Sequence, residues 1–337
     1  MLYYVAREQH RYTIDRFLQS LRWHWPKPAR FIQAVGYETL FALKRAPVGN
    51  YVFTDIDRLS GYEIDAAAEI VKGLRKSDPS TMIANEPQRV LGRYALLRRL
   101  YESGFNSFNV WRLDEERAPN AYPVFIRREQ DALGPESVLL YSEAEYRSAV
   151  AALQSSGKGL AGRIAIQYVP YGDAQGHFRK YGSFHFRGRV VPQHLMIADS
   201  WIVKRSAGET SPANAKEELN YVRTNPHAEH VRKVFQLAET DFGRVDYCVM
   251  NGRIETFEIN TNPNFPKARS NDDGQQARRE VVIKGVLQGF SDLDPPHSVG
   301  GVAKFHFPKP RLHRLRARSA WRRIGDVATG VRWRLRS

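Results

Sequence analysis

The sequence predicts an α/β protein with more than one subdomain, and three observations support this prediction. The chain has 337 residues, which is more than a single hydrophobic core usually needs. Over about the first 88 residues, short apolar runs alternate with amphipathic segments, as strands and helices do in an α/β unit. The stretch 242–266 has the pattern of two antiparallel strands, so the later part of the chain is expected to be α+β.

The first 88 residues contain clear strand and helix signals. Ile14, Phe17 and Leu21 have helical spacing, whereas the apolar segment 30–43 fits either a strand or a helix. The elements expected here are strands at 1–7, 51–54 and 82–84, and helices at 12–21 and 64–74.

Two aspartates follow the strand at 51–54. Asp55 and Asp57 would lie at the carboxyl end of that strand, where open α/β sheets bind ligands. They could hold a metal or act as a base, or they could make the local hydrogen bonds of a turn. We prefer the turn interpretation.

The rest of the chain continues the alternation of helices and strands. Ser142 with Glu145 three residues later is a capping box that begins a helix, and the small and polar residues of 205–218 predict a mobile loop. The other elements expected are helices at 94–101, 142–153, 227–240 and 278–290, extended segments at 105–113, 122–127, 163–169 and 201–204, a hairpin over 181–198 that turns at 187–189, and a linker at 292–301.

The charge of the chain is unevenly distributed. The formal net charge is +15, but residues 301–337 contain eleven Lys or Arg and one acidic residue, Asp326. The basic character therefore belongs mostly to the tail, and no specific nucleic-acid-binding surface is expected on the globular body.

Several classes of protein are disfavoured by what the sequence lacks. Cys248 is the only cysteine, which excludes an intramolecular disulfide and fits a reducing cytosol. No apolar run is long enough to span a membrane, and the first residues do not resemble a signal peptide. No P-loop, dinucleotide fingerprint, zinc-ligand spacing or Ser-His-Asp order is present. We therefore expect a cytoplasmic protein.

The stretch 242–266 carries the strongest functional signal. Alternating apolar residues on both sides of Asn251-Gly252 predict a hairpin with a tight turn. Such a hairpin places Asp246 beside Glu258 and Asn260, while Glu255, an odd number of residues from Glu258, should face the other side. Oxygen ligands of this kind suit Mg²⁺. Without a cation the two crowded carboxylates should repel each other. The alternative is a hairpin whose polar face is simply solvated.

The order R-V-D, an Asn-Gly turn and E-I-N-T-N-P resembles the metal-binding hairpin of the ATP-grasp superfamily, in particular D-alanine–D-alanine ligase and glutathione synthetase. This resemblance implies that Asp246, Glu258 and Asn260 hold two Mg²⁺ ions on the phosphates of ATP. It also implies that Arg244 stabilises the transferred phosphoryl group and the tetrahedral intermediate.

The same resemblance suggests residues that bind the nucleotide. Arg93 and Arg127 stand where the family commonly has two lysines, and an arginine can also bind phosphate. Gln167 and Val169 occupy the segment that lies beside the adenine, with Gln in place of the usual Glu. Asp173 is a candidate for a ribose hydroxyl. Arg93 and Asp173 could equally be solvated or salt-bridged surface residues.

Three further residues fall where the family faces the γ-phosphate and the acceptor substrate. They are Lys180, His194 and Lys204. His194 could instead be a packed or surface histidine, and this is the interpretation we prefer.

The resemblance also implies an architecture. It places an N-terminal α/β domain at 1–88, a small lid subdomain at 89–170, a central metal-binding domain at 171–291, and a linker with a basic tail at 292–337. The implied activity is an ATP- and Mg²⁺-dependent ligation in which a small-molecule or peptide carboxylate is phosphorylated and then attacked by an amine or another nucleophile. A phosphotransferase on the same fold, a non-catalytic nucleotide-binding protein and a protein that binds through its tail remain open.

The tail from residue 304 to 337 interleaves arginines with apolar residues such as Leu312, Trp321 and Val331. A basic amphipathic helix of this type suits an anionic membrane surface or an acidic partner. A helix packed on the body, with its charges in water, fits the pattern as well.

Overall fold

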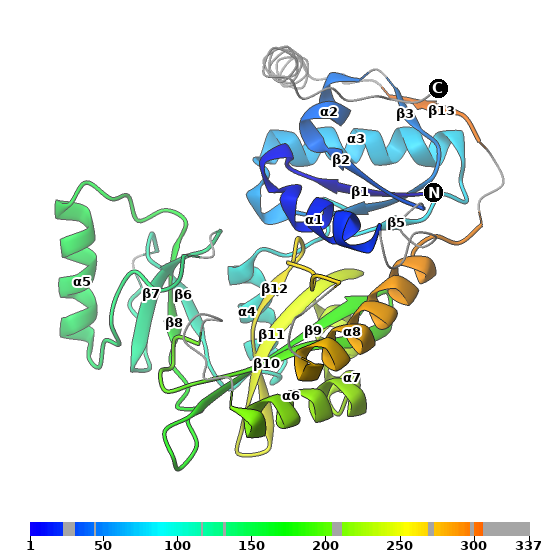
Figure 1. Ribbon diagram of the computed structural model, residues 1–337. Coiled ribbons are helices and arrows are strands. Elements are labelled where there is room, and N and C mark those ends of the chain that lie inside the picture. Colours follow the sequence, from blue (N-terminus) through cyan, green and yellow to red (C-terminus); the bar gives the residue numbers. More distant parts are fainter. Residues whose placement is uncertain are drawn as a thin grey trace.

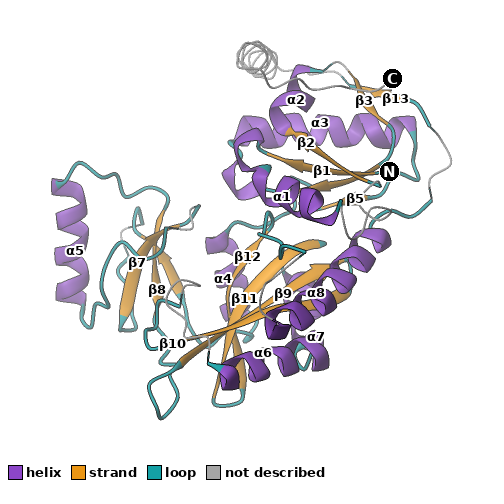
Figure 2. Ribbon diagram, viewed as in Figure 1, coloured by secondary structure: helices purple, strands orange, loops and turns teal. Residues whose placement is uncertain are grey.

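The computed structural model describes residues 1–22, 31–43, 45–115, 117–130, 133–203, 211–268, 273–296 and 300–305. Helices and sheets are both present in the described residues (Figure 2), so the α/β class is confirmed. The N-terminal domain packs on a central domain, and a smaller lid stands to one side (Figure 1).

The N-terminal domain is built on a four-stranded parallel sheet with the order β2-β1-β4-β5. The segment 30–43 resolves into a strand followed directly by a helix. The strands are β1 (Leu2–Ala6), β2 (Ile32–Gly36), β4 (Asn50–Phe53) and β5 (Ile83–Ala84), and the helices are α1 (Tyr12–Leu21), α2 (Tyr37–Ala42) and α3 (Gly61–Ser77). Helix α3 begins with a capping box made by Ser60 and Glu63.

A short C-terminal strand returns to the N-terminal domain. β13 (Val302–Lys304) pairs with β3 (Arg45–Pro47), and Ala303 is fully buried against α3 and the parallel sheet. The prediction that everything after residue 292 is linker and tail is therefore wrong for this strand. Residues 306–337, and with them nearly all of the basic tail, lie outside the described residues.

The lid consists of a three-stranded antiparallel sheet, β6-β8-β7, with one helix on its outer face. The helix begins as expected, because the Ser142 side chain accepts a hydrogen bond from the Glu145 N–H. The elements are β6 (Val110–Arg112), β7 (Val124–Arg128), β8 (Arg163–Gln167) and α5 (Glu143–Ser155).

Helix α4 (Arg93–Glu102), expected in the lid, packs on the central domain as well. Leu97 joins the cluster of Val110 and Ile164 in the lid, whereas Leu96 and Leu100 are buried in the core of the central domain, and α4 lies beside β12 (Figure 1).

The central domain is an antiparallel sheet with the order β10-β9-β11-β12. Two hairpins form it, and both turn at a pair of residues with positive φ, Arg187-Gly188 and Asn251-Gly252. The elements are β9 (Phe178–Phe186), β10 (Arg189–Ala198), β11 (Phe242–Met250), β12 (Arg253–Asn260), α6 (Pro212–Thr224), α7 (Ala228–Leu237) and α8 (Asp273–Asp292).

Two expectations for the central domain need correction. Residues 201–203 do not form a strand. The Trp201 ring instead packs against Phe125 of the lid, at 5.0 Å between ring centroids. The expected loop 205–218 contains the start of α6, since Ser211 caps the helix and Pro212 occupies its first position. Both are helix-start signals. Residues 204–210 lie outside the described residues.

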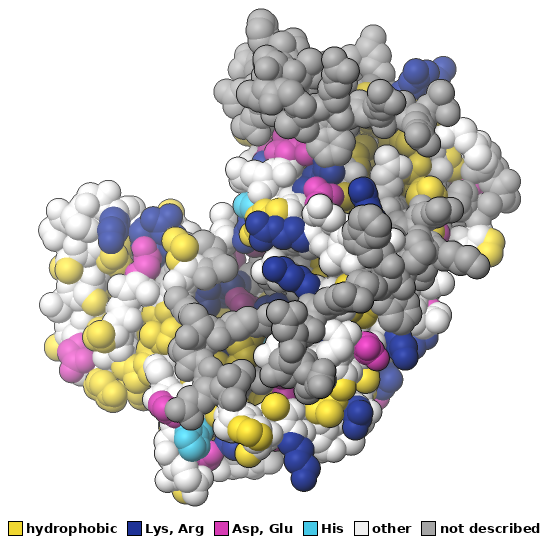
Figure 3. Space-filling view, viewed as in Figure 1, with side chains coloured by type: hydrophobic (Ala, Val, Ile, Leu, Met, Phe, Trp, Pro, Cys, Tyr) yellow, Lys and Arg dark blue, Asp and Glu magenta, His cyan; other side chains and the backbone are white. Residues whose placement is uncertain are grey.

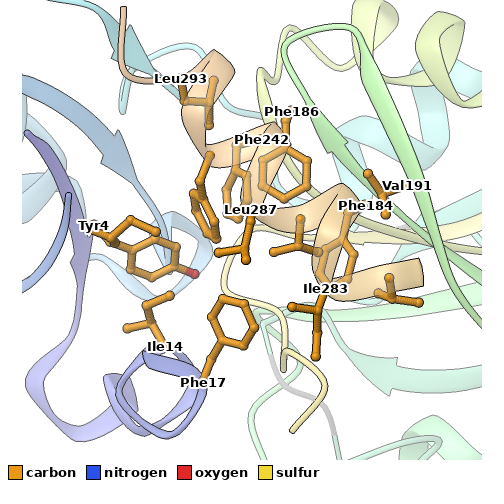
Figure 4. Close-up of a cluster of buried hydrophobic side chains, with 14 of the residues drawn as sticks. Tyr4, Ile14, Phe17, Phe184, Phe186, Val191, Phe242, Ile283, Leu287 and Leu293 are labelled. Carbon is orange, nitrogen blue, oxygen red and sulfur yellow. The ribbon is translucent and has the colours of Figure 1, made fainter. Parts of the chain in front are cut away.

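One hydrophobic core joins the N-terminal and central domains. Tyr4 of β1 and Phe17 of α1 pack with Phe242 of β11 and the inner face of α8 (Figure 4). Each large apolar side chain buried in this way contributes about 1.5–3 kcal/mol relative to an exposed one. The N-terminal sheet is therefore held firmly against the hairpin of residues 242–260.

Among the described residues, no helix is both long and apolar enough to cross a membrane.

The contact between α8 and β9 gives a stability prediction. A Cβ at Gly289 would lie 2.4 Å from Cγ of the buried Phe186 ring. Gly289→Ala should therefore lower the melting temperature, because overpacking typically costs about 1–3 kcal/mol and exceeds the gain of about 1 kcal/mol from helix propensity. Thermal melts check this.

Gly61→Ala is the matched control, since nothing lies within 4 Å of a Cβ at this first position of α3. This variant should be as stable as wild type or slightly more so. An undiminished melting temperature for Gly289→Ala would contradict the packing.

Candidate functional site

The hairpin of β11 and β12 brings the expected carboxylates together. Asp246 pairs directly with Glu258 in the strand register, and Arg244 pairs with Asn260. Directly opposite residues have side chains on the same face. The hairpin geometry inferred for Asp246, Glu258 and Asn260 is therefore confirmed, whereas their roles as metal ligands remain a prediction.

A β-bulge interrupts the hairpin next to Asp246. Asp246 pairs with Glu258 but Tyr247 pairs with Thr256, so Phe257 is an extra residue. Glu255 pairs with Cys248 in the register set by the turn, on the same face as Asp246, and the bulge brings Glu258 onto that face as well. The expectation that Glu255 faces the other side is wrong.

Cations surround both carboxylates. Arg244 makes two hydrogen bonds to Asp246, of 2.7 and 3.1 Å, and Lys180 Nζ lies 3.3 Å from the same carboxylate. Arg93 forms an ion pair with Glu258 and also donates to the Glu129 carbonyl at 2.6 Å. These cations therefore compensate the repulsion that was expected between the two carboxylates.

The pKa values of both carboxylates follow from these neighbours. Burial alone would raise the pKa of Asp246, but Arg244 and Lys180 outweigh it and lower the pKa below the ordinary value. Burial also opposes ionisation of Glu258, yet Arg93 lowers its pKa despite the nearby charge of Asp246. Both groups are ionised at neutral pH.

An apolar pocket of about 200 Å³ opens beside the carboxylates, between the lid and the central sheet. Its walls are mainly aromatic and aliphatic, and Arg127, Lys180, Asp246 and Glu258 line one end. The apolar wall includes Leu97, Phe108, Phe125, Ile166, Tyr168, Val169, Tyr171, Trp201, Val203 and Phe257. Basic and acidic side chains gather in the hollow between the domains (Figure 3).

Arg127, Gln167 and Val169 all line this pocket, as expected for nucleotide-binding residues. Arg127 pairs with Ile164 in the lid sheet, so it shares the pocket face with Ile164 and Phe125. The Gln167 side-chain carbonyl already accepts a hydrogen bond from the Asn109 N–H at 3.1 Å. Its oxygen has a second lone pair and its NH2 group two N–H donors, so the carboxamide can offer both an acceptor and a donor to a ligand.

Asp173 and His194, two of the expected site residues, do not line the pocket. Asp173 accepts hydrogen bonds from the N–H groups of Gln175 and His177 and pairs with Arg179, so it closes a turn. His194 is buried beside the site, with its ring against Gly182, the strand partner of Asp246. Catalysis by His194 and ribose binding by Asp173 remain predictions.

Lys204 lies outside the described residues, although its neighbour Val203 lines the pocket.

Asn262 is an important residue that the sequence analysis did not single out. Its side-chain oxygen accepts hydrogen bonds from Tyr4, at 2.9 Å, and from Thr13, at 2.7 Å. Its backbone N–H donates to the Asn260 side chain at 2.9 Å. Asn262 thus ties the N-terminal domain to the end of β12, and its position inside E-I-N-T-N-P was the available signal.

Among the described residues, no group of three or more His, Cys, Asp or Glu side chains could hold a metal ion. The site has two carboxylates and one amide instead. This donor set fits Mg²⁺, which commonly takes one or two carboxylates together with phosphate oxygens and water.

No protein-family model and no curated protein matches the chain. Among solved structures, it is similar to a D-alanine–D-alanine ligase from Bacillus anthracis complexed with ATP, at 12% identity over 87% of this chain and 99% of that chain, with a TM-score of 0.45. It is also similar to a RimK-domain ATP-grasp protein from Sphaerobacter thermophilus, at 13% identity over 84% and 100% of the chains and a TM-score of 0.47.

A D-alanine–D-alanine ligase from Coxiella burnetii is similar at 11% identity, over 97% of this chain and 98% of that chain, with a TM-score of 0.46. Identities and TM-scores this low assign no activity, so a proposal for function has to rest on the geometry of the site.

The ion pairs of Asp246 give a prediction for the protein without ligands. Asp246→Asn removes the charge that compensates Arg244 and Lys180 and should destabilise the fold by about 3 kcal/mol, the scale for breaking a buried ion pair. This reverses the expectation from repelling carboxylates. Thermal melts of wild type and variant measure the difference.

The difference should depend on pH. Because the folded pKa of Asp246 is lowered, its pairing stabilises the fold above the unfolded pKa of about 3.9 and is lost as the pH falls through the folded pKa. The two melting temperatures should therefore converge below about pH 4. Glu102→Gln, which breaks an exposed pair with Arg98, should show no such trend. Equal stability of Asp246→Asn and wild type at pH 7 would refute the pairing.

Proposed function

We propose that this chain is an ATP-dependent ligase of the ATP-grasp type, which phosphorylates a carboxylate and passes the acyl group to a nucleophile. The observation that carries the proposal is the meeting of two carboxylates and four cations at one end of an apolar, aromatic-walled pocket. The cations are Arg93, Arg127, Lys180 and Arg244.

The pocket has two ends with different chemistry. The Trp201 ring lies 5.0 Å from that of Phe125 and 5.6 Å from that of Tyr168, between centroids, and such a wall can stack on a nucleobase. The cationic end suits the phosphates, since phosphoryl transfer depends mainly on positioning and on positive charge. A base at the aromatic end and phosphates at the cationic end would orient ATP along the pocket.

The ion pairs of the site fit a mechanism in which its cations exchange carboxylate partners for phosphate partners. Arg93 and Lys180 neutralise Glu258 and Asp246, and the same side chains are placed to move onto phosphate oxygens. Asp246, Glu258 and Asn260 would hold Mg²⁺, which would supply positive charge beside the phosphates when bound. Every charge keeps an opposite partner in both states, which a buried site requires.

Arg127 should bind the nucleotide and contribute little to folding. Arg127→Ala should weaken Mg²⁺·ATP binding by about 1.5–3 kcal/mol, the scale of a hydrogen bond to a charged group. Arg127→Lys keeps the positive charge and should retain most of the affinity. Calorimetric titration of the three proteins measures this, and equal affinities for Arg127→Ala and wild type would show that the strand does not face the phosphates.

A screen of carboxylates tests the reaction itself. Wild type is incubated with Mg²⁺·ATP, hydroxylamine and individual carboxylic acids, and both ADP and hydroxamate are measured. At least one acid should give both products, because hydroxylamine traps an acyl phosphate. Glu258→Gln should lower the rate at least about a hundredfold, since a Gln cannot compensate the metal charge.

Glu102→Gln serves as the control and should keep the wild-type rate. Binding of Mg²⁺·ATP without hydroxamate from any acid would indicate a nucleotide-binding protein instead of a ligase. ADP release with a phosphorylated product that does not react with hydroxylamine would indicate a phosphotransferase.

A further inference from the structure

A second group of charged side chains lies at the carboxyl ends of the N-terminal strands. Asp55 follows β4 with a φ of +59°, a left-handed conformation that strains a residue other than glycine. Its carboxylate is 1% exposed and accepts hydrogen bonds from the Arg7 N–H, at 3.3 Å, and from Nδ1 of His10, at 2.8 Å. The turn interpretation preferred for Asp55 is wrong, because the carboxylate reaches back to the segment after β1.

Asp55 fixes the tautomer of the His10 ring. A carboxylate accepts hydrogen bonds, so Nδ1 carries a proton, and in the neutral ring Nε2 is then the nitrogen with the lone pair. Nη1 of Arg58 lies 2.9 Å from Nδ1 and 3.0 Å from Nε2. A position almost equidistant from the two ring nitrogens lies over the ring, out of line with the in-plane lone pair of Nε2, so the guanidinium of Arg58 covers the face of the His10 ring.

His10 is tied directly to the hairpin that carries the carboxylates. Its carbonyl accepts a hydrogen bond from the Asn262 side chain at 3.3 Å. Asn262 in turn donates its N–H to Asn260. Two hydrogen-bonded steps thus separate His10 from the end of β12.

The surroundings of His10 suit a cationic ligand. Arg7 is engaged by Glu63 and Glu38. Arg58 lies among Asp55, Asp57 and His10 and is 32% exposed, so a cation of the chain itself already occupies this place. Asp57 is 42% exposed. An ammonium group could pair with the Asp55 and Asp57 carboxylates in the place of the Arg58 guanidinium.

We propose that His10, positioned by Asp55, is the base that takes a proton from an amine nucleophile, an inference that rests on the proposed ligase function. Nε2 accepts one proton of the incoming ammonium group, and Asp55 stabilises the resulting imidazolium. The freed nitrogen lone pair forms the bond to the acyl carbon. The bond from that carbon to the phosphate oxygen breaks, phosphate leaves with the electron pair, and the leaving phosphate takes the second proton from the nitrogen.

The test uses one carboxylate, the acid that gives the strongest signal in the hydroxylamine screen, and compares its reaction with two kinds of nucleophile. Hydroxylamine is largely uncharged at neutral pH and needs little help from a base. The probe amines are α-amino acids and linear diamines, and their amino groups are protonated at this pH. His10→Asn keeps a donor toward Asp55 but lacks the basic nitrogen. Asp55→Asn suits the left-handed backbone but no longer supports the imidazolium.

Both variants should form hydroxamate within a fewfold of the wild-type rate. Their rate of amide formation with the amines should fall about a hundredfold or more, the usual contribution of a general base. A merely structural role would lower both rates together. His230→Asn, a change on α7 where the ring packs against Phe105, should leave both rates unchanged.

Each other outcome has a definite meaning. Equal amide formation by His10→Asn and wild type, or a parallel loss with both nucleophiles, overturns the role of His10. Hydroxamate formation by wild type without transfer to any amine overturns the amine as nucleophile. If wild type forms no hydroxamate with any acid, the ligase proposal itself fails.

Discussion

Two buried carboxylates that face each other in an antiparallel register need compensating cations, and the rest of the site follows from this constraint. The register pairs Asp246 with Glu258, and the cations arrive from three different elements: β9, β11 and α4. Removing two charges from water is expensive unless each finds a close partner. The same cations can serve phosphate groups once a metal ion neutralises the carboxylates, so the resting ion pairs and the proposed chemistry use one set of residues.

The geometry of this cluster depends on how the N-terminal domain is docked. A shared hydrophobic core sets the position of the parallel sheet, and two buried amides fix its orientation. Asn262 connects β12 to Tyr4 and Thr13. Asn85 bonds to both the N–H and the carbonyl of Phe242, at 2.9 and 2.8 Å. Fully satisfied buried amides of this kind tolerate little displacement. The carboxyl ends of the N-terminal strands therefore stay next to the end of β12.

This arrangement gives the two halves of the molecule different tasks. The lid and the central sheet form an apolar pocket whose cationic end suits a nucleotide. The N-terminal sheet contributes the pair of His10 and Asp55, with a cation already beside it. Under the proposed function, an activated carboxylate would form at the junction, and the amine would approach from the N-terminal side. The strained backbone at Asp55 is stabilised by the burial and hydrogen bonds of its carboxylate.

Local signals in the sequence determined much of this protein. The helix at 12–21, the Asn-Gly hairpin and the cap at Ser142 depend on periodicity, turn residues and local hydrogen bonds, all of which act over a few positions. The Asn-Gly turn also fixed the register next to it, which places Glu255 opposite Cys248. Only the structure revealed the bulge at Phe257, which brings Glu258 opposite Asp246. The tertiary structure also decided that Arg93 and Lys180 are counter-ions and that β13 pairs with β3. Ion pairs and strand pairing join residues that are distant in sequence, and the periodicity of a sequence does not report such contacts.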